Sequence, residues 1–283
     1  MKTVYQHTMN GLLTERLKKI EEHLCSDVIF FYGDIHDGIE RVFRDFIEDL
    51  KNDQDEQTNR DTLSIILNTN GGSVETVERM VRTTRQHYNK VDFIIPDSAY
   101  SAGTIFCMSG DEIYMDYSSA LGPIDPQVNN GQRWVPALGY IDKVKQILNN
   151  PNPTYSEIEW LRVQDMAFIQ ACEQAKNLTV SLLKDWLVKY KFKNWNTRHS
   201  SGESVTMEYK QQRAEQIATQ LGNNTYWLSH SRPIGIRQLQ DLKLIISDYT
   251  DDLKFSELIR NYNDLMCQSI GDVRNFLHSR KNI

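Results

Sequence analysis

Short apolar runs alternate with amphipathic segments through the first third of the chain, and this alternation constrains the fold more than any other feature of the sequence. The apolar runs lie at residues 27–33, 62–68 and 91–96, and each has the length of a buried strand. The segments between them, residues 38–50 and 74–88, carry apolar side chains at helical spacing. Two consecutive strand–helix–strand units predict a parallel sheet with helices on its faces.

Further elements extend this pattern along the chain. A short fourth strand is predicted at residues 112–115 and another strand at residues 244–246, while apolar residues at helical spacing predict a helix at residues 137–148. The expected fold is therefore of the α/β class, with a mostly parallel sheet, flanking helices and a helical C-terminal part.

Three units are expected along the chain. Residues 1–25 are predicted to form an amphipathic N-terminal helix, and residues 26–250 the main domain, with a helical insertion at about residues 151–222. Residues 251–283 are predicted to form a C-terminal tail that is helical to about Leu277.

Charge and cysteine content exclude several classes of function. The net charge of -6 and the isoelectric point near 5.7 argue against a nucleic-acid-binding surface, because phosphate binding needs clustered Lys and Arg. The four cysteines are far apart and form no CxxC pair, so neither a zinc site nor a disulfide framework is expected. Charged residues interrupt the apolar ones near the N-terminus, so we expect no signal peptide, no membrane span and a cytoplasmic protein.

Two glycine-bearing turns mark the candidate site. Gly71 and Gly72 follow the second strand, and Ser101 lies in a turn that follows the third. Ligands of parallel sheets bind beyond the carboxyl ends of the strands, where both turns are expected. Paired glycines let the backbone approach a ligand closely, and a serine at the start of a helix is either a capping residue or a candidate nucleophile beside free amides.

Four short segments, taken together, carry a family resemblance. They are NGGSV at residues 70–74, YSAGT at 100–104, GDEIYM at 110–115 and LGPIDPQ at 121–127. In this order they closely resemble the serine dehydrogenase proteinase family, which belongs with signal peptide peptidase A and the Clp protease proteolytic subunit in the Clp/crotonase superfamily. The resemblance covers about residues 27–127 and returns at WLSHSRPI, residues 227–234, and at residues 242–246.

The resemblance implies a fold, a reaction and part of a site. The fold would be the Clp/crotonase-like core of repeated ββα units, within residues 26–250. The reaction would be that of a serine endopeptidase acting on a peptide or protein, with neither a metal nor an organic cofactor. Ser101 would be the nucleophile, and the backbone amides of Gly72 and Ala102 would form the oxyanion hole. Superfamily relatives form rings or symmetric oligomers, so a homo-oligomer is expected, with the N-terminal helix and the C-terminal tail as candidate contacts.

The general base does not follow from the same segments. In the Clp subunit a histidine lies in the segment that corresponds to residues 121–127, whereas this chain has Asp125 there and no histidine between His87 and His199. Signal peptide peptidase A and its archaeal membrane-protease relatives instead use a lysine downstream of the serine, and a desolvated lysine can act as a base. The resemblance therefore favours a Ser–Lys dyad over a Ser–His–Asp triad.

Lys143 is the preferred base, with Lys145 and His230 as alternatives. The two lysines are two residues apart on a predicted helix, so at most one of them can face the site. Lys143 lies four residues before Ile147, which belongs to the apolar face of that helix. His230 lies in a Ser- and Pro-containing segment that is typical of turns and caps.

Two other functions remain open at this level. A pseudo-protease would hold a peptide in the cleft, or scaffold an assembly, without cleaving it. A crotonase-like acyl-CoA enzyme would use the same oxyanion amides to stabilise an enolate, and would leave Ser101 without a role.

Overall fold

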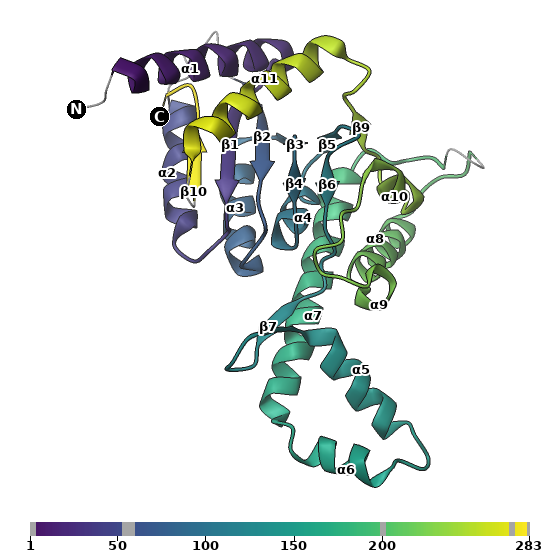
Figure 1. Ribbon diagram of the computed structural model, residues 1–283. Helices are drawn as coiled ribbons and strands as arrows, with labels where there is room; N and C mark the ends of the chain where they lie inside the picture. Colours follow the sequence, from purple (N-terminus) through teal and green to yellow (C-terminus); the bar gives the residue numbers. More distant parts are fainter. Residues whose placement is uncertain (1–3, 53–59, 199–201, 272–274, 282–283) are drawn as a thin grey trace.

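The computed structural model describes residues 4–52, 60–198, 202–271 and 275–281, which form a sheet with helices on both faces and an arm that extends from one end (Figure 1). The sheet has the strand order β10-β1-β2-β3-β5-β9. Its strands are β1 (Asp27–Gly33), β2 (Thr62–Asn68), β3 (Lys90–Ile95), β5 (Glu112–Met115), β9 (Ser247–Asp248) and β10 (Asn275–His278). All neighbouring pairs are parallel except β1 and β10. The expected α/β fold with a mostly parallel sheet is confirmed.

Helices and short strands complete the described chain. The helices are α1 (Val4–Leu24), α2 (Ile39–Asn52), α3 (Val74–His87), α4 (Ala102–Cys107), α5 (Ala137–Leu148), α6 (Tyr155–Arg162), α7 (Met166–Trp186), the π-helical turn η1 (Leu187–Lys191), α8 (Met207–Leu221), α9 (Asn224–Trp227), α10 (Ile236–Asp241) and α11 (Leu253–Ile270). The short strand pairs are β4 (Ser98–Ala99) with β6 (Ala120–Leu121) and β7 (Gln127–Asn129) with β8 (Trp134–Pro136).

Alternate residues of the central strands face two different layers of helices. On β1, Val28 and Phe30 belong to a core that includes α1 and α11, whereas Ile29 and Phe31 belong to a core that includes α2, α3 and α4. A strand that is covered on both faces needs apolar residues at every position, which is why the sequence shows continuous apolar runs here. Leu13, Leu17 and Ile20 of α1 are buried in this core, so this face of α1 packs on the body of the chain.

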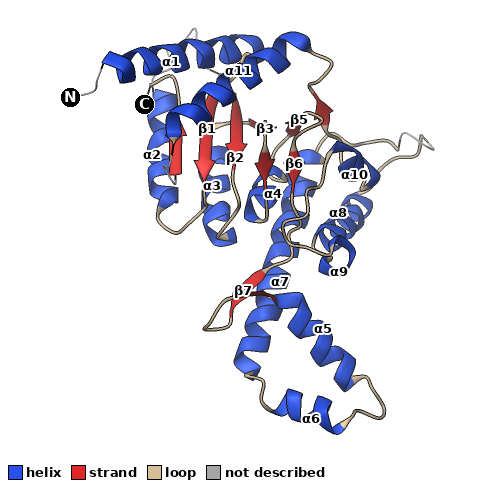
Figure 2. Cartoon of the chain, in the orientation of Figure 1, coloured by secondary structure: helices blue, strands red, loops and turns tan. Residues whose placement is uncertain are grey.

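The arm consists of the β7–β8 hairpin, α5, α6 and the first part of α7 (Figures 1 and 2). It has a small core of its own, in which Ala137 and Ile141 of α5 pack with Cys172 of α7. From the arm, α7 continues into the body, where Leu183 and Trp186 join the larger core. This one helix therefore contributes to the cores of both the arm and the body.

The C-terminal segment differs from the prediction. A helical tail was expected to about Leu277, but α11 ends at Ile270 and residues 275–278 form β10, antiparallel to β1. An edge strand of this kind is specified by its pairing with a distant strand rather than by its own periodicity. The strand predicted at residues 244–246 is also displaced, since β9 comprises Ser247–Asp248.

The described chain has neither a membrane-spanning helix nor a cluster of metal-binding side chains. None of its helices combines the length and apolar character needed to cross a bilayer. Its histidine, cysteine and acidic side chains form no group suited to holding a metal ion.

His278 introduces an uncompensated polar atom beneath the α11 layer. Its Nδ1 lies 2.6 Å from the hydroxyl oxygen of the buried Tyr262, but its Nε2 is buried without a hydrogen-bond partner in the described chain. Burial lowers the pKa of His278 to about 4, because a charged imidazolium would lose its hydration there. The folded state therefore binds this proton more weakly than the unfolded state.

We predict that His278 makes the fold sensitive to acid. Its contribution to stability is complete above the unfolded pKa of about 6.5 and is lost as the pH falls towards 4, by on the order of 2–3 kcal/mol. Urea unfolding at pH 7 and pH 4.5 should show a smaller loss for His278→Gln, which keeps an acceptor for Tyr262, than for the unmodified protein. His7→Gln, at an exposed position, should behave like the unmodified protein. Equal losses in all three proteins would contradict this account.

Candidate active site

The loop after β1 binds the Gly71–Gly72 turn through two backbone hydrogen bonds. The Ile35 N–H donates to the Gly71 carbonyl oxygen over 2.8 Å, and the Ser73 N–H donates to the Ile35 carbonyl oxygen over 2.7 Å. The φ angles of Gly71 and Gly72 are 100° and 140°, a region that disfavours residues with a Cβ atom. The turn then leads into α3, whose first turn Ser73 caps through its side chain.

The same turn lies directly against Ser101. A Cβ atom on Gly71 would be 2.5 Å from the Tyr100 carbonyl oxygen and 2.8 Å from the Ser101 Cβ, and one on Gly72 would overlap the Ile35 carbonyl oxygen. Only glycine allows this approach, so the two turns that the sequence singled out form one structural unit.

Ser101 has an unusual backbone conformation. Its φ and ψ angles are 53° and -120°, and positive φ is uncommon for a residue other than glycine. Two neighbouring elements hold the backbone of Ser101 in this conformation. The residues of α4, which follow it, are all buried. The preceding residue, Tyr100, donates a 3.0 Å hydrogen bond from its N–H to the carbonyl oxygen of Thr69. The Ser101 side chain makes no capping hydrogen bond to α4, which argues against a purely capping role.

Two backbone amides beside Ser101 are free. Neither the Gly72 N–H nor the Ala102 N–H has a hydrogen-bond acceptor within the part of the chain that the structure describes. Free amides are the donors that an oxyanion hole requires. Gly72 belongs to the glycine turn and Ala102 follows Ser101, so the two free amides come from the two turns that are in contact.

His230 and Asp125 form a hydrogen-bonded pair. The His230 Nδ1 lies 2.8 Å from the Asp125 Oδ1, and the Asp125 side chain is fully buried. The other carboxylate oxygen, Oδ2, accepts hydrogen bonds from Asn224 Nδ2 at 2.8 Å and from Gln127 Nε2 at 3.0 Å. An ionised carboxylate can only accept, so the Nδ1 of His230 donates in this pair, and in the neutral imidazole its Nε2 is the nitrogen that can accept.

A backbone bridge brings this pair together from distant parts of the chain. Leu121 and Ile234 exchange two hydrogen bonds, of 3.0 and 2.8 Å, which fix the segment that contains His230 beside the segment that contains Asp125. The sequence motifs include both segments, but nothing in their spacing predicts that the two segments are in contact. Two sequence features could have predicted the pair. Asp125 lies in a segment where the Clp subunit carries a histidine, and His230 lies in residues 227–234, where the family resemblance returns.

One cleft contains the serine, the glycine turn and the histidine. Its volume is about 980 Å³, and Ser101, Gly72 and His230 all line it. Its other walls come from the loop after β1, the β7–β8 hairpin and α7. The cleft therefore lies between the carboxyl edge of the sheet and the arm, in the region where the arm leaves the body in Figure 1.

The two predicted lysines lie elsewhere on the arm. Lys143 Nζ is 3.4 Å from Glu157 Oε1 of α6 and 3.4 Å from Gln146 Oε1, and Lys145 is exposed on α5. Neither residue lines the cleft. Lys143 faces α6 because α5 directs Ile141 and Val144 into the packed interior, which turns the neighbouring position towards Glu157.

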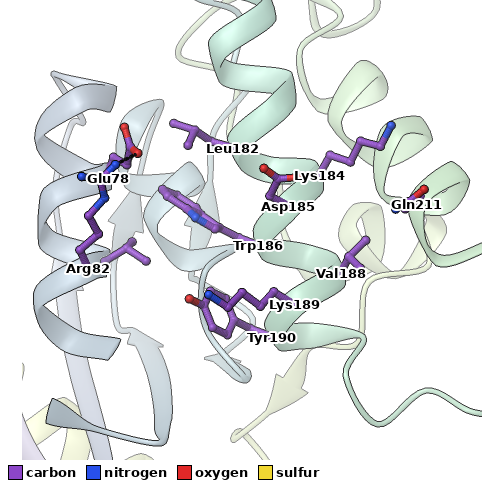
Figure 3. A pocket seen from close by; sticks show the side chains of 11 residues that line it. Glu78, Arg82, Leu182, Lys184, Asp185, Trp186, Val188, Lys189, Tyr190 and Gln211 are labelled. Atoms are coloured by element: carbon purple, nitrogen blue, oxygen red, sulfur yellow. Dashed lines mark hydrogen bonds and ion pairs between the residues drawn. The ribbon is translucent and has the colours of Figure 1, made fainter. Parts of the chain in front are cut away.

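A second hollow, of about 450 Å³, lies between α3 and the junction of α7 with η1 (Figure 3). Its charged side chains are partly paired, as in the ion pairs of Glu78 with Arg82 and of Lys184 with Glu215. None of the predicted site residues is among the described residues that line it.

Comparison with known proteins identifies relatives of the chain. A family model described as "ClpP-like SDH-type serine proteinase" matches residues 29–210. Two uncharacterised proteins of Methanocaldococcus jannaschii, MJ1495 and MJ0137, are 24% identical over 185 residues and 26% identical over 181 residues. These alignments cover 65% and 62% of the chain but only 52% and 60% of the relatives, so the chain spans less than two thirds of either relative's length.

Solved structures give a weaker likeness. Two mutants of the 1510-N membrane-bound stomatin-specific protease, one of them in complex with a substrate peptide, are 19% and 21% identical to the chain. Each match covers 58% of the chain, and 70% and 67% of the respective structures, with a TM-score of 0.34.

Because the two turns are in contact, we predict that a side chain at Gly71 strongly destabilises the folded protein. Gly71→Ala should lower the free energy of unfolding by about 3 kcal/mol or more, since the methyl group adds overlap with Tyr100 and Ser101 to the backbone strain. Gly131 has a φ of 88° and no atom within 4 Å of an added Cβ, so Gly131→Ala should cost only about 1 kcal/mol. Similar costs for the two variants in urea unfolding would show that the turns are not in contact.

Proposed function

Because the chain belongs to the ClpP-like SDH-type serine proteinase family, we propose that it is a serine endopeptidase that cleaves peptides through an acyl-enzyme on Ser101. The resemblance seen in the sequence is thereby confirmed at the level of the family. The observation that carries the proposal is the presence of Ser101, Gly72 and a carboxylate-bound histidine in one cleft, with the free amide of Ala102 next to Ser101 in the chain.

In the proposed acylation step, Ser101 Oγ attacks the carbonyl carbon of the scissile peptide bond. His230 Nε2 accepts the hydroxyl proton and then transfers it to the leaving amine, while Asp125 accepts the Nδ1 hydrogen bond and stabilises the imidazolium. The N–H groups of Gly72 and Ala102 donate to the oxyanion of the tetrahedral intermediate. In the second step, water activated by His230 hydrolyses the ester and restores Ser101.

His230 is preferred to Lys143 as the base for a geometric reason. A base has to reach the nucleophile's proton, and His230 lines the cleft whereas Lys143 is bound to Glu157 outside it. A Ser–His–Asp assignment therefore replaces the Ser–Lys dyad as the proposed mechanism. Lys145 is likewise not among the described residues that line the cleft.

Assembly and location stay predictions. A homo-oligomer and a cytoplasmic location are both compatible with the family. The pseudo-protease alternative differs from the proposal only in whether Ser101 reacts. Measurements of peptide turnover and of fluorophosphonate labelling distinguish the two.

Kinetics of variants should distinguish the possible bases. Ser101→Ala and His230→Gln should each lower kcat/KM for a quenched fluorogenic peptide by roughly 10³-fold or more, because each removes a member of a unit that acts together. Asp125→Asn should also lower it, by roughly 10²-fold or more, since the histidine would lose its orienting partner. Lys143→Met, which keeps the length of the side chain, should retain activity within about threefold.

Each alternative gives a different result in the same assay. Loss of activity in Lys143→Met with retention in His230→Gln would establish the Ser–Lys dyad. No turnover by the folded protein, combined with failure of a fluorophosphonate to label Ser101, would support the pseudo-protease. Circular dichroism and urea unfolding of every variant provide the control for folding.

A further inference from the structure

The two sides of the Ser101 cleft differ in chemistry. On the side of the body, the loop after β1 and the first turn of α3 contribute Asp34, Asp37 and Glu75. On the side of the arm, α7 and the β7–β8 hairpin contribute mainly apolar residues. The cleft therefore presents carboxylates and an apolar wall to the same occupant.

The apolar wall is a stripe on α7. Phe168, Ala171, Ala175 and Leu178 are spaced by three, four and three residues, so they lie on one face of the helix. Each of them is exposed or half-buried, and Trp134 of β8, which is 67% exposed, continues the wall. Covering this apolar surface with apolar side chains of a substrate would remove it from water, which contributes favourably to the free energy of binding.

The three carboxylates are exposed, and none of them is paired with a Lys or Arg in the described chain. Asp37 accepts a hydrogen bond from Thr76 Oγ1 at 2.9 Å and Glu75 accepts one from Ser73 Oγ at 3.2 Å, but none of the three forms an ion pair with a Lys or Arg of the described chain. No Lys or Arg is among the described residues that line the cleft. A cleft lined by charge of one sign concentrates the field and attracts the opposite charge.

An extended peptide can satisfy both sides at once. Successive side chains of an extended chain point in opposite directions, so a basic residue and an adjacent apolar residue reach opposite walls. Resting on the proposed function, we propose that the cleft selects substrate segments in which Lys or Arg is adjacent to apolar residues, through Asp34, Asp37 and Glu75 on one side and the α7 stripe on the other. Acidic segments are rejected by the same carboxylates.

Equilibrium binding tests this selection without relying on turnover. Fluorescein-labelled peptides of equal length, with Leu-Lys, Leu-Gln, Leu-Glu and Ser-Lys repeats, are titrated with the Ser101→Ala protein and followed by fluorescence anisotropy. The Leu-Lys peptide should bind roughly tenfold more tightly than the Leu-Gln peptide at low salt, and the Leu-Glu peptide most weakly. The Ser-Lys peptide should also bind weakly, because it leaves the α7 stripe uncovered. The advantage of Leu-Lys should shrink at high salt, where exposed charges are screened.

Charge-removing variants assign the effect to the cleft. In the Ser101→Ala background, Asp34→Asn with Asp37→Asn should remove most of the preference of Leu-Lys over Leu-Gln. The matched control is Asp49→Asn with Asp61→Asn, which removes the same charge from two exposed positions outside the cleft and should leave the preference unchanged. Equal binding of the Leu-Lys, Leu-Gln and Leu-Glu peptides, no binding of any peptide, or equal effects of the two double variants would each overturn the proposal.

The outcome is independent of the catalytic proposal. Selective binding by a protein that shows no turnover would leave the selection intact and overturn the peptidase function. Turnover by the unmodified enzyme without any preference for the Leu-Lys peptide would overturn the selection and leave the peptidase function intact.

Discussion

The close packing of the Gly71–Gly72 turn against the Ser101 turn is the constraint on which the rest of the site depends. It requires glycine at both positions, a positive φ at Ser101 and a fully buried α4 to hold the serine in place. The parallel sheet makes this possible, since the carboxyl ends of neighbouring strands bring successive loops to the same edge. The result is a hydroxyl group and two free amides in a fixed relation before any substrate binds.

The histidine and aspartate reach this edge by a different route. Burying the Asp125 carboxylate would be costly without partners, but Asn224, Gln127 and His230 donate to it together. Two of these donors come from the segment after α8, which the Leu121–Ile234 bridge fixes to the loop after β6. The return of the chain to this edge therefore satisfies a buried charge and orients a base in a single arrangement.

This division explains what the sequence could and could not predict. The strands β1 to β3 and the helices α3 and α5 follow from local periodicity, and the importance of Ser101, Gly72 and Ala102 follows from short contiguous motifs. His230 and Asp125 are 105 residues apart, and their contact depends on a bridge that no periodicity reveals. The strand β10 was missed for the same reason, because its register is set by β1. Lys143 looked suitable because of its helical position, yet the packing of α5 on α7 turns it towards α6.

The most direct measurement of the central claim is a crystal structure of the protein after reaction with a fluorophosphonate. The account predicts a covalent bond between phosphorus and Ser101 Oγ, with the phosphonyl oxygen accepting hydrogen bonds from the N–H groups of Gly72 and Ala102, and with His230 Nε2 within hydrogen-bond distance of the adduct. An adduct in which the Lys143 or Lys145 ammonium group occupies the place of His230, or one formed on a residue other than Ser101, would contradict it.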